Sequence, residues 1–385
     1  MNGRAAHPGR DDRDGCGDRD GCDDRDGCDD HDGCDDHDGY GGYGAYDVLV
    51  LGEVLVEVHA GRPLRKAAPG TAARISYSGD ALNAAAAAAA AGARTALLAV
   101  VGEEELTVPL LEHATALGID VRHVRRSPRP NGAYLLAAET DTATRAGTHG
   151  DTDADVAGKG DGDREFVYWR TGSAGSTLSA GHVESWLPLL VSGASLITSG
   201  ITGALSGSSR EAVIAAAEAV HAAGGHVTYD PNFRARLTSG AEARALLARL
   251  APLTGLLKTS CPADAGALVG TADPREAAGR YRELGARTVA VTAGAERLLL
   301  QEGGGPARFL PVPVNPHPVD ATGAGDCFTG TVTARLALGD PLGAAVAYGA
   351  AAASLSVSGR GGTGRVPSFA ETTALAARQS AAWSP

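Results

Sequence analysis

Long apolar runs are missing from this sequence. A membrane-spanning helix needs about 20 apolar residues in succession, and the alanine run at residues 84–91 is far too short. Basic stripes of the kind that bind nucleic acid are missing as well. The N-terminus also lacks the charged-then-apolar layout of a signal peptide. We therefore expect a cytoplasmic protein with neither a membrane nor a nucleic-acid partner.

Aromatic residues are scarce too, at 4% of the 385 residues, and methionine occurs once. Hydrophobic residues nevertheless make up 43% of the chain. That fraction is enough for a sizeable core in one large α/β domain or in two ordinary domains.

Most of the net charge of −12 lies at the N-terminus, where residues 1–42 hold 14 aspartates and 5 arginines. This segment repeats a six-residue unit of the type RDGCDD and has no apolar residues with which to form a core. We therefore expect residues 1–45 to be a disordered tail. A zinc site is the alternative, because thiolate and imidazole are zinc ligands. Its candidate ligands are Cys16, Cys22, Cys28, Cys34, His31 and His37.

From Tyr46 onward, short apolar runs alternate with helical patterns rich in alanine and leucine. Strands are expected around residues 47–51, 95–101, 194–200, 226–232, 256–260 and 287–294, and helices at 80–91, 208–223 and 274–284. We expect Asp80 to cap the first of these helices and Gly92 to end it. This alternation predicts an α/β fold with a mostly parallel sheet and helices on both faces. Ligands of such sheets bind at the carboxyl ends of the strands.

One segment interrupts the alternation. Residues 131–138 and 164–170 read as two antiparallel strands, joined by the polar stretch 140–163, which has the composition of a disordered insertion. Together with strands near 53–60 and 74–78 they predict a small β-sheet lid on a domain that spans residues 46–370, followed by a C-terminal tail at 371–385. Calcium binding by the aspartates of the insertion is the alternative, although the glycine and the terminal glutamate of a calcium loop are missing.

Residues 318–330 read PVDATGAGDCFTG and lie between an apolar stretch at 308–314 and a helical pattern at 328–338. Unpaired amides and the peptide dipoles make the start of a helix attractive to phosphate or to a developing oxyanion. Asp326 follows three small residues at this point and can accept a proton from a hydroxyl group. An anion site and a base within one turn suit phosphoryl transfer to an alcohol. A glycine-rich cap with Asp326 as the N-cap is an equal alternative on these grounds.

The segment DATGAGDCFTG resembles the C-terminal signature of the ribokinase (PfkB) family of carbohydrate kinases. Gly52 and Glu53, and the segment SGDALNAA from Ser78, resemble a second family region, with Ser78 in place of a glycine. The resemblance covers Tyr46 to about Ser368 and implies a ribokinase-like fold, ATP as the phosphoryl donor, and Mg²⁺. It makes Asp326 the catalytic base and places the anion hole at Gly323, Ala324 and Gly325. It also implies that Gly52, Gly79, Asp80 and Asn83 bind the substrate.

The expected lid resembles the segments of 2-keto-3-deoxygluconate kinases that place two tyrosines and an arginine at the substrate. The corresponding residues here are Tyr134, Tyr168 and Arg170, and the segment YDPNFRARL adds Asn232, Arg234 and Arg236. A sugar acid needs a cation for its carboxylate, and arginine offers a planar, bidentate one. Alternatively, these arginines form ion pairs or cap the helix after Thr238.

Other positions are expected at the nucleotide. By the resemblance, Asn232, Ser260, Gly294, Thr322, Gly323 and Gly325 contact the cofactor, and Asp264 contacts the metal through water. The sequence departs from the family pattern at Thr292 and Arg297, and SCPAD, from Ser260, stands where many members have Asn and Glu. We expect His317 to be structural, leave the role of Asp320 open, and expect Cys261 and Cys327 to pack in the core.

Three functions remain open. The first is an ATP-dependent kinase for a sugar acid, 2-keto-3-deoxygluconate above all. The second is a kinase for a neutral sugar such as fructose or for another small substrate of the family, and the third is a sugar-binding relative without turnover. Relatives that pair through their lids lead us to expect a homo-oligomer.

Overall fold

The computed structural model describes residues 46–137 and 166–381. The hexad repeat with its candidate ligands Cys16, Cys22, Cys28, Cys34, His31 and His37, the insertion at 140–163 and residues 382–385 lie outside the described residues. Within the two described stretches, no helix has the length and apolar character that crossing a membrane requires.

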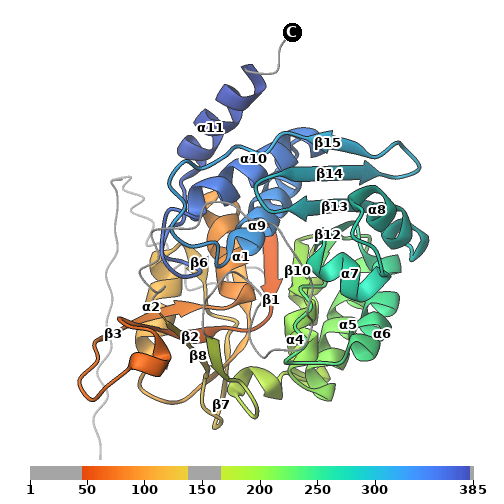
Figure 1. Ribbon diagram of the computed structural model, residues 1–385. Coiled ribbons are helices and arrows are strands. Elements are labelled where there is room, and N and C mark those ends of the chain that lie inside the picture. Colours follow the sequence, from red (N-terminus) through yellow and green to blue (C-terminus); the bar gives the residue numbers. More distant parts are fainter. Residues whose placement is uncertain (1–45, 138–165, 382–385) are drawn as a thin grey trace, which may run out of the picture. The chain divides into compact units, whose positions relative to one another are not determined.

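A nine-stranded sheet forms the centre of the described structure (Figure 1). In spatial order its strands are β15 (Arg308–Leu310), β14 (Arg297–Glu302), β13 (Thr288–Ala293), β12 (Leu256–Ser260), β11 (Val227–Asp230), β10 (Ser195–Ser199), β1 (Val48–Leu51), β4 (Thr95–Leu98) and β6 (Ile119–Asp120). All neighbours from β6 to β13 run parallel, and β14 and β15 extend the sheet in antiparallel fashion. The parallel strands are short and buried, as expected where helices cover both faces of a sheet.

Helices cover both faces of this sheet (Figure 1). They are α1 (Asp80–Ala90), α2 (Thr107–Ala116), α3 (Ala180–Leu190), α4 (Gly200–Ala204), α5 (Gly207–Ala222), α6 (Gly240–Leu250), α7 (Ala263–Val269), α8 (Pro274–Glu283), α9 (Ala324–Ala337), α10 (Leu342–Ser356) and α11 (Phe369–Ala381), with short 3-10 helices η1 (Leu64–Lys66), η2 (Ala174–Thr177) and η3 (Ala251–Leu253). α1, α2, α9 and α10 pack on one face, and α3, α5, α6, α7 and α8 pack on the other.

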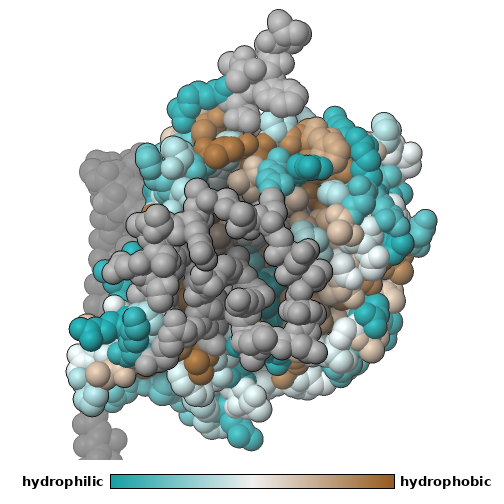
Figure 2. Space-filling view, in the orientation of Figure 1, coloured by the Kyte–Doolittle hydropathy of each residue, from teal (hydrophilic) through white to brown (hydrophobic). Residues whose placement is uncertain are grey.

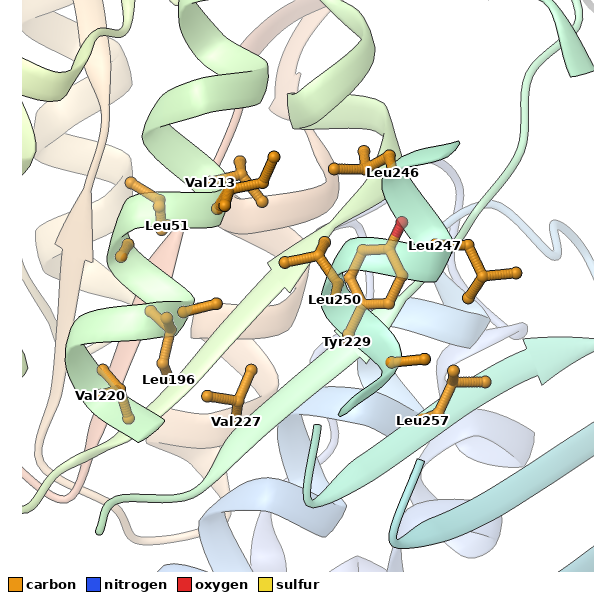
Figure 3. Close-up of a cluster of buried hydrophobic side chains, with 14 of the residues drawn as sticks. Leu51, Leu196, Val213, Val220, Val227, Tyr229, Leu246, Leu247, Leu250 and Leu257 are labelled. Atoms are coloured by element: carbon orange, nitrogen blue, oxygen red, sulfur yellow. The ribbon is translucent and has the colours of Figure 1, made fainter. Parts of the chain in front are cut away.

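The sheet divides the hydrophobic core into two sides. Because successive side chains of a strand point to opposite faces, Leu49 and Leu51 of β1 join the cluster under α5, whereas Val48 and Val50 join the cluster under α1. Figure 3 shows the first cluster, in which Tyr229 of β11 lies among leucines of α6 and the neighbouring strands. Full burial of a Val or Leu side chain stabilises the fold by roughly 1.5–3 kcal/mol, so these rows fix the position of the strands.

A second sheet of four strands lies apart from the first (Figure 1). Its order is β3 (Ala73–Ser78), β2 (Leu55–Ala60), β8 (Gly132–Ala137) and β9 (Phe166–Trp169). β2 pairs antiparallel with β3 and parallel with β8, and β8 pairs antiparallel with β9. The mostly parallel main sheet, the helices on both of its faces and this small sheet confirm the predicted fold class.

Helix α1 lies close to α9 because small residues form the contact. A Cβ atom on Gly330 of α9 would overlap the backbone carbonyl oxygen of Ala84, so glycine is needed there. The close approach brings Asn83 of α1 within hydrogen-bonding distance of Asp326, which lies in the first turn of α9.

Three sequence-based expectations differ from the structure. The N-cap of α1 is Gly79, with a φ of 122° that favours glycine, and Asp80 is the first helical residue instead of the cap. The single strand expected at 95–101 is two strands, because β5 (Val100–Gly102) leaves the main sheet after Ala99 and pairs with β7 (Arg125–Ser127). Residues 371–381 of the expected tail belong to α11. Glu371 and Ser368 bond reciprocally at the start of α11, a capping box that stabilises the helix.

The surface in Figure 2 is mixed in character. Hydrophilic residues lie along the edge formed by α8, and hydrophobic surface gathers near α10 and β15. Phe309 of β15 is 43% exposed, and the guanidinium of Arg275 from α8 lies over its ring at 4.7 Å. This cation–π contact shields part of the exposed ring.

Candidate active site

The start of α9 supplies free backbone donors. Gly323 is the N-cap, with a φ of 76°, and the Ala324 amide donates to the carbonyl of Ala321 at 3.1 Å. Within the described part of the chain, the amides of Gly325 and Asp326 have no hydrogen-bond partner. Two of the first amides of the helix are therefore available to an anion, whereas the Ala324 amide, expected in the anion hole, is used by the local turn.

Asp326 is half-buried, and its carboxylate accepts a hydrogen bond from Nδ2 of Asn83 at 2.9 Å. Burial raises the pKa of Asp326 to about 7, a net value that includes the raising effects of the Asp80 and Asp230 carboxylates and the lowering effects of Asn83 and Lys258. A carboxylate with a pKa near neutrality is suited to accept a proton from an alcohol. A Cβ atom on Gly323 would lie 3.1 Å from Asn83 Nδ2, so the loop before α9 also touches Asn83.

Asp80 is buried at the start of α1, where protein donors surround its carboxylate. Ser199 and Thr202 donate their hydroxyls, the latter at 3.0 Å, and the amide of Glu53 donates at 3.3 Å. A Cβ atom on Gly52 would lie 2.7 Å from the Thr202 hydroxyl, so Gly52 leaves room for this cluster. Ser199 and Thr202 were not among the expected site residues, although Ser199 ends a buried parallel strand, where site residues gather.

The small sheet contributes Tyr134, Tyr168 and Arg170. The two tyrosine rings lie 5.7 Å apart, and the Arg170 guanidinium lies over the Tyr168 ring at 4.6 Å. The Tyr134 hydroxyl donates to the buried carboxylate of Glu57. These contacts bring the three side chains together on one part of the small sheet.

Arg170 lies beside a buried carboxylate that sequence analysis did not assign. Its Nε is 3.3 Å from Oε2 of Glu53, which is 1% exposed. Neither group makes a well-directed hydrogen bond within the described residues. Burial raises the pKa of Glu53 to about 7, although Arg170 lowers it. Arg170 therefore forms the ion pair that was the alternative to a contact with a substrate carboxylate.

Among the residues expected at the nucleotide, Asn232, Ser260 and Gly294 lie at or just after the carboxyl ends of β11, β12 and β13, and Thr322 lies in the loop before α9. Asn232 adopts a φ of 39°, and its amide donates to Asp230 at 3.1 Å. Gly294 lies exposed in the turn after β13 with a φ of 56°. The amide of Thr322 donates to Asp320 at 2.8 Å. The structure thus places Asn232 and Thr322 in local turns, and Gly294 at the surface.

Two arginines and two residues near the signature lie outside this cluster of contacts. Arg234 is exposed, and its Nη1 donates to the carbonyl of Phe233; Arg236 is exposed as well. Asp320 accepts from the amides of Thr322 and Gly361, which ties the signature loop to the segment after α10, and His317 is exposed.

Lys258 of β12 is the main residue that sequence analysis missed. Its side chain is 7% exposed, and its Nζ donates to Asp230 at 2.8 Å. A Cβ atom on Gly325 would lie 2.6 Å from this Nζ, so the ammonium group touches the first turn of α9. The signal was present in the sequence, because a lysine in the middle of the apolar run LLKTS is buried only when it is paired.

Asp264, the candidate metal ligand, is engaged by the protein. Its oxygens accept from the Phe233 amide at 2.9 Å, from the Ser260 hydroxyl at 2.7 Å and from the Ser260 amide at 3.2 Å. No group of three His, Cys, Asp or Glu side chains able to hold a metal occurs in the described stretches. Both free cysteines of the described stretches, Cys261 and Cys327, are buried, as expected for core packing.

Comparison with known proteins identifies the family of the chain. The model of the pfkB family carbohydrate kinases matches residues 46–368. A 2-dehydro-3-deoxygluconokinase from Thermoproteus tenax is 32% identical over 341 residues, which cover 85% of this chain and 93% of the relative.

Two solved structures illustrate the likeness of fold. A PfkB protein from Polaromonas sp. JS666 is 27% identical, with a TM-score of 0.69 over 86% of this chain and 100% of its own. A putative ribokinase II from E. coli, in complex with ATP and Mg²⁺, is 22% identical, with a TM-score of 0.72 over 87% of this chain and 100% of its own. The predicted ribokinase-like fold is confirmed, and the chain belongs to the pfkB family of carbohydrate kinases.

Proposed function

We propose that this kinase transfers the γ-phosphoryl group of ATP to a hydroxyl of a sugar acid, with 2-dehydro-3-deoxygluconate (2-keto-3-deoxygluconate) as the substrate and its 6-phosphate as the product. The observation that carries the proposal is the convergence of the Asp326 carboxylate, Asn83 and the free amides of Gly325 and Asp326 at the start of α9. The relative from Thermoproteus tenax supports the choice of substrate.

Asp326 accepts the proton of the attacking hydroxyl in this proposal, and Asn83 fixes the orientation of the carboxylate through its hydrogen bond. The amides of Gly325 and Asp326 stabilise negative charge on the transferring phosphoryl group, as oxyanion donors do. Asp80 holds the end of β10 and the following helix α4 against α1 through Ser199 and Thr202. Its oxygens reach the sugar hydroxyls only if the substrate displaces one of these donors.

ATP fits the start of α9, because two unpaired amides and a buried ammonium group meet there. Magnesium is usually held by one or two carboxylates together with substrate phosphates and water. The oxygens of Asp264 already accept from three protein donors, so we propose that nucleotide phosphates and water supply most of the ligands of the ion.

Two substrate classes remain in competition at Arg170. A sugar acid would bring a carboxylate to this guanidinium, where a bidentate contact is favourable. A neutral sugar is the second candidate, because Glu53 already lies 3.3 Å from Arg170 and offsets its charge. With the acid bound, Glu53 with a pKa of about 7 is able to take up a proton, which leaves Arg170 free for the substrate.

The test is a coupled assay of ADP release by the purified full chain, with 2-dehydro-3-deoxygluconate, 2-dehydro-3-deoxygalactonate, fructose and ribose as acceptors. We expect turnover of the acids, and a loss of about a thousandfold or more in kcat for Asp326→Asn, because the base is removed while its shape is kept. Unchanged turnover in Asp326→Asn would contradict the assignment of the base.

The variant Arg170→Met separates the two substrate classes in the same assay. We expect the kcat/KM of the acids to fall by about a hundredfold or more, since a charge-assisted bidentate contact is lost, and that of fructose to change little. An equal effect on acids and on fructose would favour the neutral-sugar alternative. Absence of turnover with every acceptor would favour the sugar-binding relative without catalysis.

A homo-oligomer that pairs through the small sheet is also proposed. One face of this sheet carries a row of apolar side chains, Ile75, Val58, Leu135 and Val167, which lie side by side in the strand register. Ile75 is 53% exposed, Val167 40%, and the neighbouring Trp169 57%. Exposed apolar surface of this kind supports association with a second copy.

A further inference from the structure

The buried lysine of β12 needs a physical explanation. Lysine is among the residues that are almost never fully buried unless they are paired, yet Lys258 is 6% exposed and stands in a strand whose other residues are apolar or hydroxylic. Replacing a whole buried ion pair by apolar side chains of similar volume is often neutral or stabilising. Stability alone therefore gives little reason for a lysine at this position.

The strand register determines where the ammonium group lies. Tyr229 of β11 pairs with Leu257 of β12, so Asp230 and Lys258 are the next neighbours and their side chains point to the same face of the sheet. Asp230 holds the Nζ of Lys258 at 2.8 Å. This bond lies at the carboxyl end of the parallel strands, where ligands of such sheets bind.

The start of α9 lies directly over this ammonium group. A Cβ atom at residue 325 would lie 2.6 Å from Nζ and 3.6 Å from Cε of Lys258. The backbone can approach Lys258 this closely only because residue 325 is glycine. The unpaired Gly325 amide and the Lys258 ammonium group are therefore adjacent hydrogen-bond donors, and both carry positive charge.

Carboxylates surround this cation. Burial lowers the pKa of Lys258, but Asp230, Asp264 and Asp326 raise it more, so the net direction is upward and the group stays an ammonium ion. The charged groups with the largest effects on the pKa of Asp326 are Asp80 from α1, Asp230 from β11 and Lys258 from β12, and of these three Lys258 is the cation.

We propose that Lys258 is a catalytic residue that binds the transferring phosphoryl group beside the first amides of α9, with Asp230 as the positioning residue that aims its ammonium group. The proposal deepens the kinase function proposed above and rests on it. Lys258 adds a full positive charge where the helix start alone supplies a partial one.

The transfer step moves one proton and one phosphoryl group. The substrate hydroxyl gives its proton to the Asp326 carboxylate while its oxygen forms a bond to the γ-phosphorus of ATP. The bond from that phosphorus to the bridging oxygen breaks, and ADP leaves with the electron pair. Lys258 and the amides of Gly325 and Asp326 stabilise the charge on the oxygens of the phosphoryl group, and Asp326 later releases its proton to water.

The test compares Lys258→Met with the control Lys66→Met, which makes the same change at an exposed lysine of η1. For Lys258→Met we expect kcat to fall by about a hundredfold or more, as for the loss of one oxyanion donor. Titration calorimetry in the presence of Mg²⁺ is expected to show about tenfold weaker binding of the β,γ-imido analogue of ATP and unchanged binding of ADP. Lys66→Met is expected to match the wild type in each measurement.

The double variant Asp230→Asn with Lys258→Met separates catalysis from folding, because it removes both charges of the buried pair. We expect its melting temperature to return toward the wild-type value while turnover stays low. Recovery of turnover in the double variant would overturn the proposal, as would an equal loss of affinity for the analogue and for ADP in Lys258→Met. If the wild type turned over no sugar, the function proposed above would fail, while the difference between analogue and ADP would still decide the role of Lys258.

Discussion

At the scale of single residues, the central feature is a carboxylate whose protonation is balanced by its neighbours. Burial raises the pKa of Asp326 to about 7, and the hydrogen bond from Asn83 Nδ2 at 2.9 Å opposes that rise. A base is active in its deprotonated form, so we expect kcat/KM to rise with pH and to level off above a pH of about 7.

Asn83→Ala tests this balance. Removal of the hydrogen bond takes away a contribution that lowers the pKa of Asp326, so we expect the acidic limb of the profile of kcat/KM against pH to move to higher pH. We also expect kcat at high pH to fall about tenfold or more, because the carboxylate loses its orientation. Glu105→Gln, at an exposed position, serves as the control. If the acidic limb of the profile did not move, the pKa of Asp326 would not be the one that determines its position.

Glu53 shows a similar effect of burial at a position without hydrogen-bond donors. Its carboxylate is 1% exposed, and Arg170 lies beside it without a well-directed bond. Because the folded pKa of Glu53, about 7, lies above its ordinary value, the protonated form stabilises the folded state. That contribution is complete below a pH of about 4 and is lost as the pH rises through about 7.

At the scale of elements, the contact between α1 and α9 positions the base. Gly330 lets α9 approach the backbone carbonyl of Ala84, and the same approach sets the distance between Asn83 and Asp326. We expect Gly330→Ala to destabilise the fold by about 1–3 kcal/mol, as overpacking does, and to lower kcat because the two helices separate.

The matched control for this change is Gly279→Ala in α8. A Cβ atom there meets nothing within 4 Å, so the gain in helix propensity, up to about 1 kcal/mol, should dominate. Denaturant unfolding and the coupled assay on both variants provide the measurement. Equal stabilities of the two variants would contradict the importance of the close contact.

The sequence predicts the elements that local patterns determine and misses what depends on tertiary contacts. The strands β10, β11, β12 and β13 and the helices α5 and α8 lie within two residues of their expected bounds. Asp80 looks like an N-cap in the sequence, but Ser199 and Thr202 bind its carboxylate in the folded chain, and both are distant in sequence. Strand β4 ends at Leu98 because β5 pairs separately with β7, which no local pattern reveals.

In the candidate site, too, the local features were predictable from the sequence and the tertiary contacts were not. The motif around Asp326 predicts a helix start with free amides, because such a site is local. The pairing of Lys258 with Asp230, and that of Arg170 with Glu53, depends on strand order and on the packing of the small sheet. Only the position of a lysine inside an apolar run pointed to the first pair. An ion pair was the alternative expected for Arg170, but nothing in the sequence identified Glu53 as its partner.

At the scale of the whole molecule, the small sheet has two different faces. One face carries Glu57 and Tyr134, which bond to each other, and Gly362 of the segment after α10 donates its amide to Glu57 as well. The opposite face carries the row that includes Ile75 and Val167, both well exposed. A surface of this kind is expected to find an apolar partner, and a two-fold pair of identical sheets would bury it on both copies.

Trp169→Glu combined with Ile75→Glu tests this association. Each side chain is more than half exposed, so a charge is tolerated in an isolated subunit but is costly when it is buried in an interface. We expect the wild type to elute as a dimer in size-exclusion chromatography with light scattering, and the double variant to elute as a monomer with its circular dichroism unchanged. Leu187→Glu on α3, at a position that is 46% exposed, is the matched control and should remain dimeric. A monomeric wild type, or a double variant that stayed dimeric, would show that copies of this chain do not pair through the apolar face of the small sheet.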